Sequence, residues 1–137
     1  MRVLIDANVL LDVLCKREPF FDDSALVWKL CETERIEGYV SVLTYANLVY
    51  ILRKSLRPVD VDDVLDRLKL VFHFADFTVA DLTEAAFVMW DDFEDAVQSA
   101  AATRIGAEFI ITRDEDDYAQ SAVPALSPSA FLQRYSR

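Results

Sequence analysis

Aspartate follows two strongly apolar runs of the sequence, one near each end of the chain. Residues 3–5 lead directly into Asp6, and residues 109–112 lead into an acidic stretch that contains Asp114. Short apolar runs without polar alternation are typical of buried strands in a parallel sheet, and ligands bind beyond the carboxyl ends of such strands. Asp6 and Asp114 are therefore candidate active-site residues. For Asp6 alone, the competing interpretation is an N-cap for a helix over residues 7–14.

A third acidic group lies at the start of an expected helix. Asp92 and Asp95 are three residues apart, so they can share one face of a helix that continues through an alanine-rich segment to Arg104. Acidic side chains in a first helical turn are also stabilised by the helix dipole, so each acidic group has a structural explanation when taken alone. That explanation is weaker if all three groups meet at one place.

Carboxylates that meet in this way need a counter-charge. Two of them about 4 Å apart repel by roughly 4 kcal/mol at an effective dielectric constant near 20. Carboxylate oxygens suit Mg²⁺ or Mn²⁺, and such an ion can activate water and stabilise charge on a transferring phosphoryl group. The residue types therefore predict metal-assisted hydrolysis of a phosphodiester.

The net charge of −10 limits how this protein can meet a polyanion. Proteins that bind nucleic acid through phosphate contacts alone are usually basic, so this one would have to meet nucleic acid locally, by a small basic patch or through bound cations. The alternative interpretation is that the acidic surface serves solubility. Two cysteines, Cys15 and Cys31, and the single His73 cannot form a closed zinc site, and we expect buried free thiols in a reducing cytoplasm. We expect no signal peptide and no membrane-spanning segment, because no apolar run approaches about 20 residues.

Strands and helices alternate along the whole chain, which predicts an α/β fold with a parallel sheet covered by helices on both faces. Strands are expected at residues 2–5, 38–41, 71–75 and 108–112. Helices are expected at residues 7–14, for about a dozen residues from Asp22–Ser24, at 42–54, at 61–68 with Asp60 or Asp62 near the start, at 81–90 with capping-box spacing, at 95–104, and after Pro128. The helix over residues 42–54 is apolar nearly all round, so it should be central or lie in an interface.

Taken together, three motifs resemble a PIN domain, in particular the small bacterial PIN proteins related to VapC-type toxins. They are LIDANVLLD at residues 4–12, DFEDAVQ at 92–98 and IITRD at 110–114. They occur in the expected order and cover essentially the whole chain. The resemblance implies one PIN-like domain over residues 1–137, a three-layer α/β/α sandwich with a parallel central sheet, and a Mg²⁺- or Mn²⁺-dependent endoribonuclease.

Carried over by position, the resemblance also implies the site residues. Asp6, Asp95 and Asp114 would be the catalytic, metal-binding acids, Asp117 would be a further metal ligand, and Thr112 would orient the site from the strand end.

One position departs from the family pattern. Asn47 occupies the helix position where the family usually has glutamate. An asparagine carbonyl can face a cation or its water shell, but it removes one negative charge and should weaken metal binding. Asp92 or Glu94 could supply the missing charge.

The expected partners also come from the resemblance. They are an RNA substrate, a small antitoxin that holds the enzyme inactive, and a second copy of this chain, for which the apolar segment 43–52 is the expected interface. The alternative, motivated by Asn47, is a catalytically weak or inactive PIN-like module that binds RNA or assembles with other proteins. A receiver domain of the response-regulator kind is disfavoured, because the expected late lysine is missing and Asp6 comes too early.

Overall fold

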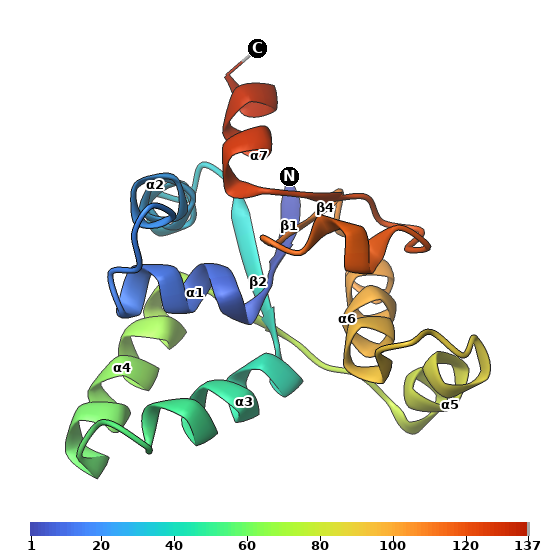
Figure 1. The fold of residues 1–137 in the computed structure, drawn as a ribbon, viewed down its shortest axis with the longest axis horizontal. Coiled ribbons are helices and arrows are strands. Elements are labelled where there is room, and N and C mark those ends of the chain that lie inside the picture. The colour runs from blue at the N-terminus through green and yellow to red at the C-terminus, as the bar shows by residue number, and fades with distance from the viewer. Residues whose placement is uncertain (137) are drawn as a thin grey trace.

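A five-stranded parallel sheet lies at the centre of the molecule, in a computed structural model that describes residues 1–136 (Figure 1). Its strands are β1 (Arg2–Ile5), β2 (Glu37–Ser41), β3 (His73–Ala75), β4 (Phe109–Ile111) and β5 (Ala125–Leu126), in the order β3-β2-β1-β4-β5. All neighbouring strands are parallel, and Leu4 of β1 pairs with Tyr39 on one side and Ile110 on the other.

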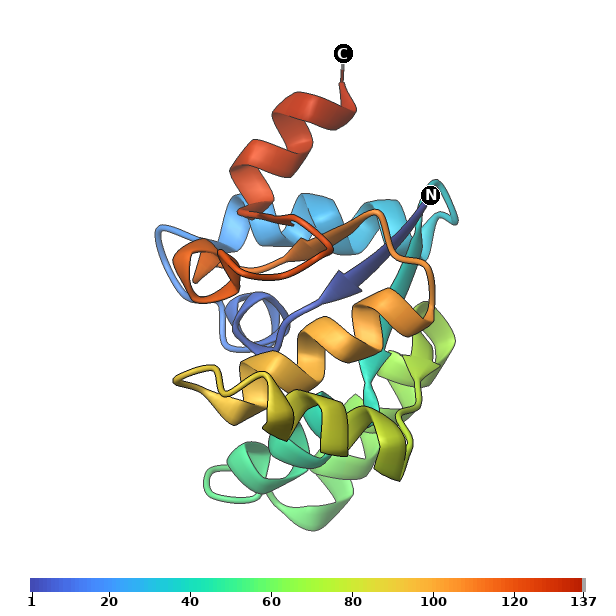
Figure 2. The same ribbon diagram turned by 90° about the vertical axis from the view of Figure 1, so that its right-hand side faces the viewer.

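Helices cover both faces of this sheet, and the alternation along β1 shows which core each face supplies. Val3 and Ile5 pack against α1 (Ala7–Leu14), α2 (Phe21–Glu32), α3 (Val42–Leu52), α4 (Pro58–Val71) and α7 (Pro128–Tyr135). Leu4 faces the other core, which includes α6 (Phe93–Arg104), with α5 (Val79–Phe87) packed on α6. Figure 2 is viewed from the side of α5 and α6. The predicted α/β/α sandwich with a parallel sheet is therefore confirmed.

Several element boundaries differ from the prediction, chiefly around α4. This helix begins at Pro58, ahead of Asp60, because proline at the first helical position has a suitable φ and needs no hydrogen-bond donor. The helix continues through Val71, so β3 begins at His73 and the strand expected from residue 71 was placed two residues too early. Phe72 is buried beneath Trp28, with the ring centroids 4.9 Å apart.

Two smaller differences concern α5 and β5. The capping box of α5 pairs Thr78 with Asp81, one turn earlier than expected from the Asp81 and Glu84 spacing. The strand β5 follows Pro124 and was not predicted. It is only two residues long, too short for any periodicity to appear.

Some expectations about single side chains were wrong. Cys31 is buried, but Cys15 is exposed, and both thiols are free. His73, between two phenylalanines in the sequence, was expected to be a half-buried structural histidine; it is exposed, and its ring lies 5.0 Å from that of Tyr39. Within residues 1–136, no helix combines the length and apolar character needed to cross a membrane.

The positions of the strand ends determine where the candidate site lies. β1, β2 and β4 run in the same direction, so Ile5, Ser41 and Ile111 end at one edge of the sheet. Helix α1 begins two residues after β1 ends, and α3 begins directly after β2. The N-terminus of α6 lies at the same edge, since its side chains contact the residue that follows β1. We call this side of the molecule the carboxyl edge.

Candidate metal site at the carboxyl edge

Asp6 lies at the centre of the carboxyl edge. Its backbone N–H donates to the Ile111 carbonyl at 3.0 Å, which ties the end of β1 to the end of β4. Its backbone is extended, as at an N-cap, but its carboxylate accepts only from the adjacent Ala7 amide at 2.8 Å within that helix. The usual cap bond reaches an amide two or three residues on. Capping of α1 therefore does not explain the position of the second carboxylate oxygen, Oδ2.

Side chains from three other segments meet the Asp6 carboxylate. Thr112 donates to Oδ2 at 2.9 Å, Tyr118 donates to Oδ2 at 3.4 Å, and Gln98 approaches Oδ1 at 3.5 Å. Burial raises the pKa of Asp6 despite these hydrogen bonds, and the nearby charge of Asp114 raises that pKa further. The protein thus encloses a carboxylate that water would stabilise better.

Thr112 connects Asp6 to the loop after β4. Its side chain is fully buried, and its hydroxyl donates to Asp6 while accepting from the Asp114 amide at 3.0 Å. Asn8 contacts the same hydroxyl at 3.3 Å and donates to the Asp114 carboxylate at 3.1 Å. Its own carbonyl oxygen accepts from the Arg113 amide at 3.2 Å. Asn8 therefore fastens the loop that carries Asp114 to the first turn of α1.

The second acidic group surrounds Asp95, in the first turn of α6. Asp92 is the N-cap and accepts from the Asp95 amide at 3.2 Å, which orients that turn. Burial raises the pKa of Asp95 to about 6, with further increases from the charges of Asp92, Asp6 and Asp117. Asp95 is therefore a carboxyl group surrounded by other carboxylates.

An open cleft of about 210 Å³ lies beside Asp95. Five acidic side chains line it, together with two apolar ones and two residues of the segment after the 3-10 helix η1 (Glu115–Tyr118). The lining residues are Asp91, Asp92, Asp95, Asp116, Asp117, Met89, Trp90, Ala119 and Gln120. No lysine or arginine is among them, so the cleft concentrates negative charge.

The structure brings the predicted site residues to one edge but not into one ligand group. Asp95, Asp92 and Asp117 line the cleft, Asp6 lies behind the Tyr118 hydroxyl, and Asp114 lies beyond Thr112. Among residues 1–136, no group of three or more His, Cys, Asp or Glu side chains is arranged to hold a metal ion. The assignment of Asp6, Asp95, Asp114 and Asp117 as ligands stays a prediction.

Two buried side chains of this edge were not selected from the sequence. The Tyr118 hydroxyl donates to Asp6 at 3.4 Å, and burial near the charges of Asp6 and Asp95 raises the pKa of that phenol, so it stays a donor. Gln98 lies one turn after Asp95 on α6, and it donates to Thr44 of α3 at 2.8 Å. The spacing of Gln98 from Asp95 was the available signal for Gln98. Tyr118 directly follows Asp117, a position that the family resemblance gives as an acid often followed by an aromatic residue, but that pattern does not predict a contact with Asp6.

Asn47, the position that departs from the family pattern, lies on α3 one turn after Thr44. Helical spacing places the two residues on one face. It is Thr44, buried and held by the Ser41 hydroxyl, that contacts Gln98. α3 therefore supplies the neutral Thr44 side chain to the network around Asp6. The family pattern would place an acid one turn further along the same helix, at position 47.

The donor set fits a hard divalent cation. Carboxylate and amide oxygens are the ligands that Mg²⁺ and Mn²⁺ prefer. The buried Gln98 carbonyl oxygen finds no donor within residues 1–136, which leaves it available to a cation or its water shell. A positive charge would also relieve the repulsion that raises the pKa of Asp95.

Comparisons with known proteins agree on the fold. A family model described as PIN domain matches residues 2–116. No curated protein matches the chain. Three similar solved structures illustrate the likeness. VapBC2 from Rickettsia felis bound to a promoter DNA fragment has a TM-score of 0.73 at 15% identity, over 93% of this chain and 98% of that one.

The other two structures are described as a toxin-antitoxin complex and as a toxin. A toxin-antitoxin complex from Klebsiella pneumoniae has a TM-score of 0.65 at 19% identity, over 92% of this chain and 97% of that one. VapC20 from Mycobacterium tuberculosis, described as a sarcin-ricin loop cleaving toxin, has a TM-score of 0.67 at 16% identity, over 86% and 94%. At these identities the likeness shows the fold alone.

Proposed function

This chain belongs to the PIN domain family, and from that premise we propose that it is a Mg²⁺- or Mn²⁺-dependent endoribonuclease, the toxin of a toxin–antitoxin pair. One observation carries the proposal. Asp6 and Asp95 are far apart in the sequence, yet Asp6 accepts from Tyr118 at 3.4 Å, and the chain neighbours of Tyr118 line the same cleft as Asp95. Burial raises the pKa of both carboxyl groups, and the charge of Asp6 raises that of Asp95 further. Carboxyl groups with raised pKa values that converge in this way are typical of functional sites.

Asp6, Asp95 and Asp114 would hold the ion, with Asp117 as a further ligand; Asp114 approaches from the side of Thr112. When bound, the ion supplies activation of water and stabilisation of charge on the transferring phosphoryl group. The chain's own residues orient the acids. Thr112 and Tyr118 donate to Asp6, and the Asp92 cap sets the first turn of α6 so that Asp95 faces the cleft.

Asn47 and Asp92 would adjust the charge of the site. Asn47 would offer a carbonyl oxygen in place of a carboxylate, and Asp92 would supply negative charge close to Asp95, whose pKa it raises. No separate general base stands out at this edge, so the reaction depends on the ion and on the orientation of the acids.

The proposal includes a partner and an oligomeric state. Similar folds come from a VapBC2 structure and from a toxin-antitoxin complex, which supports a small antitoxin as the partner of this chain. A homodimer would use the outer face of α3, where Tyr50 is 67% and Ile51 37% exposed. A monomeric mass at micromolar concentration would contradict that dimer. We also propose a cytoplasmic location.

Asn47 favours one competing function, a PIN-like module with weak or no catalysis that binds RNA or assembles with other proteins. The two functions differ in metal affinity, because a module without an enzyme site has no need to bind Mn²⁺. Isothermal titration with Mn²⁺ separates them: no heat of binding at millimolar Mn²⁺ favours the module.

The deciding variant is Asp95→Asn, with Asp63→Asn on the surface of α4 as the matched control. We expect Asp95→Asn to lose Mn²⁺ binding and to lower Mn²⁺-dependent RNA cleavage by more than about 100-fold, since even outer-shell changes at metal sites cost 10–100-fold. The control should keep both. Full cleavage by Asp95→Asn would overturn the assignment.

A further inference from the structure

Arg113 stands between two residues of the candidate site, but its side chain leaves that site. Thr112 precedes it and donates to Asp6, and Asp114 follows it. The Arg113 guanidinium instead lies against α1, where its Nε is 2.9 Å from the Asp12 carboxylate. The proposed reaction makes no use of this side chain, so Arg113 can serve the site only through what it holds in place.

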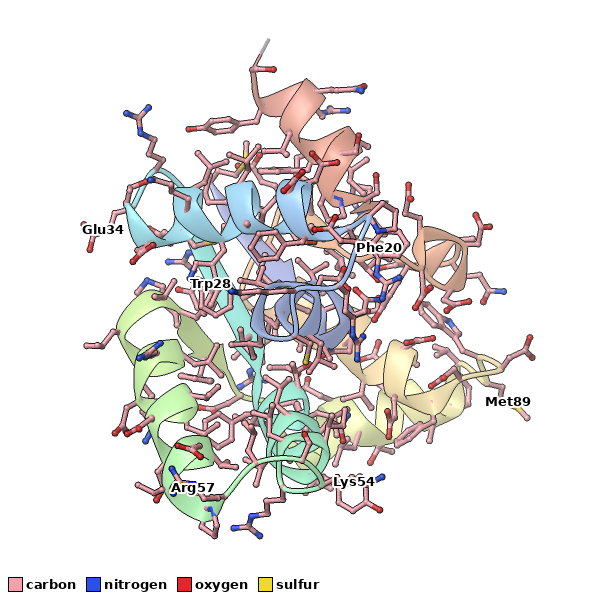
Figure 3. All side chains as sticks on the ribbon, turned by 60° about the vertical axis from the view of Figure 1, so that its left-hand side comes forward. Phe20, Trp28, Glu34, Lys54, Arg57 and Met89 are labelled. Atoms are coloured by element: carbon pink, nitrogen blue, oxygen red, sulfur yellow. The ribbon has the colours of Figure 1, made fainter. Side chains whose placement is uncertain are left out.

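Asp12 receives Arg113 inside the protein. Its carboxylate is fully buried, and the Ser24 hydroxyl of α2 donates to the same oxygen at 3.4 Å. The Phe20 ring, at the start of α2 (Figure 3), lies 4.0 Å from the guanidinium. The arginine side chain is 27% exposed, so most of it is enclosed. A buried ion pair seldom stabilises a fold more than apolar packing would, which indicates a purpose other than stability.

Helix α1 contacts residue 113 at two points. The Asn8 carbonyl oxygen accepts from the Arg113 amide at 3.2 Å, and Asp12, one turn further along the helix, holds the side chain. Residues four apart share a face of a helix, so both contacts come from the same side of α1. One contact alone would leave the peptide free to pivot about it. Two contacts fix the direction in which the chain passes from Thr112 to Asp114.

The direction of this short segment matters because it orients an acid. The Asp114 amide donates to the Thr112 hydroxyl at 3.0 Å, and that hydroxyl also donates to Asp6 at 2.9 Å. Asn8 donates to the Asp114 carboxylate at 3.1 Å. Rotation of the chain at residue 113 would break these hydrogen bonds and move Asp114 away from Asp6.

We propose that Asp12 and Arg113 are positioning residues, which act through the backbone of residue 113 to hold Asp114 in place relative to Asp6. The pairing also keeps the arginine cation away from the acids, where it would compete with a divalent ion. This inference rests on the proposed metal-dependent function. It adds to that function two residues outside the proposed ligand set that fix the geometry of the ligands.

The test removes both charges at once, in the double variant Asp12→Asn with Arg113→Gln. No buried charge is then left unpaired, so most of the stability should remain. The matched control removes the exposed ion pair at the other end of the sheet, as Arg2→Gln with Glu37→Gln. Hydrogen exchange without metal gives the protection factors of the amides at positions 113 and 114, and isothermal titration gives the Mn²⁺ affinity. Urea unfolding measures the stability of each variant.

In the double variant we expect the protection of both amides to fall about tenfold, because local opening of the loop becomes easier. The Ile110 amide, which donates to the Pro124 carbonyl at 2.9 Å, should keep its protection. Mn²⁺ should bind roughly 10–100-fold more weakly, the usual cost of losing an outer partner of a metal ligand. The control should match wild-type protein in every measurement.

A second variant, Arg113→Lys, keeps a cation for Asp12 and therefore keeps the fold. Lysine lacks the planar guanidinium that stacks on Phe20, so protection at positions 113 and 114 should fall by a smaller factor, about threefold. Unchanged protection in both variants would overturn the inference. Wild-type Mn²⁺ affinity in a double variant as stable as wild-type protein would also overturn it, because the pair would then serve the fold alone.

Failure of the ribonuclease proposal looks different. Wild-type protein would then neither bind Mn²⁺ nor cleave RNA, whereas the protection factors, measured without metal, would still show whether the pair of Asp12 and Arg113 holds the loop that carries Asp114.

Discussion

Two arginines at opposite ends of the sheet make nearly the same contacts. Arg2, at the start of β1, places Nε 2.9 Å from a Glu37 carboxylate oxygen and its guanidinium 5.6 Å from the Tyr39 ring. Arg113, after β4, places Nε 2.9 Å from Asp12 and its guanidinium 4.0 Å from the Phe20 ring. The difference lies in exposure. The first pair is 50% and 51% exposed, whereas the second is 27% and 0% exposed.

This difference means that the charges at the amino end of the sheet cost the folded state little free energy, whereas the buried charges at the carboxyl edge destabilise it. Charges at the amino end are in water, where an ion pair contributes little to stability. At the carboxyl edge, burial raises the pKa of Asp12 even though Arg113 and Arg17 lower it. Burial likewise leads the causes that raise the pKa values of Asp6 and Asp95. Folding alone gains nothing from charges placed there, and such placement is typical of sites that serve a function.

The largest expected effect comes from breaking the buried pair. Arg113→Ala leaves the fully enclosed Asp12 without its cation, and we expect a loss of roughly 3–5 kcal/mol in the free energy of unfolding. Arg2→Ala should cost less than about 1 kcal/mol, because Glu37 remains solvated. Urea unfolding measures both.

A double variant checks the cause of that loss. Asp12→Asn with Arg113→Gln removes both charges and should recover most of the stability lost in Arg113→Ala. Equal costs for Arg113→Ala and Arg2→Ala would contradict the comparison between the two ends.

A change in the packed half of β2 should affect stability without reaching the carboxyl edge. A Cβ on Gly38 would lie 2.5 Å from the Cys31 Sγ and 2.9 Å from a ring carbon of Phe72. We expect Gly38→Ala to lower the free energy of unfolding by about 1–3 kcal/mol, as overpacking does, while Mn²⁺ affinity is unchanged. Adding Cys31→Ala should recover part of the loss. A parallel drop in Mn²⁺ affinity would show that the two ends are coupled.

The smallest expected effect is the pH dependence that Asp95 contributes. Its pKa rises from 3.8 to about 6 on folding. Its contribution to stability is therefore fully present below about pH 4 and is lost as pH rises through about 6, because the folded state binds the proton more tightly. Relative to wild-type protein without metal, Asp95→Asn should gain melting temperature from pH 4 to pH 7.5, by a few degrees.

Metal should reverse this cost, since Mn²⁺ competes with the proton for Asp95. The increase in wild-type melting temperature on adding Mn²⁺ should be larger at pH 7.5 than at pH 5. Glu37→Gln, at the amino end, should behave as wild-type protein in both melting experiments. A difference between Asp95→Asn and wild-type protein that does not change with pH would refute this account.

Local patterns predicted most of the fold. The apolar runs before Asp6 and before Asp114 are strands, and the alanine-rich segment after Asp95 is a helix. The prediction failed at one short apolar pair, because such a pair fits the end of a helix as well as the start of a strand. Val71 and Phe72 were assigned to a strand, but Val71 ends α4, and Phe72 is fixed by its contact with Trp28, far away in the sequence.

The sequence by itself determined which residue types stand at the strand ends, and their order made an acidic edge predictable. Only the tertiary structure decided which of these groups meet. Tyr118 lies 112 residues from Asp6 and Gln98 lies 92 residues from it, yet both contact its carboxylate. The physical reason is that strand and helix periodicity acts over a few residues, whereas these contacts depend on the order of strands in the sheet and on how α6 packs against it.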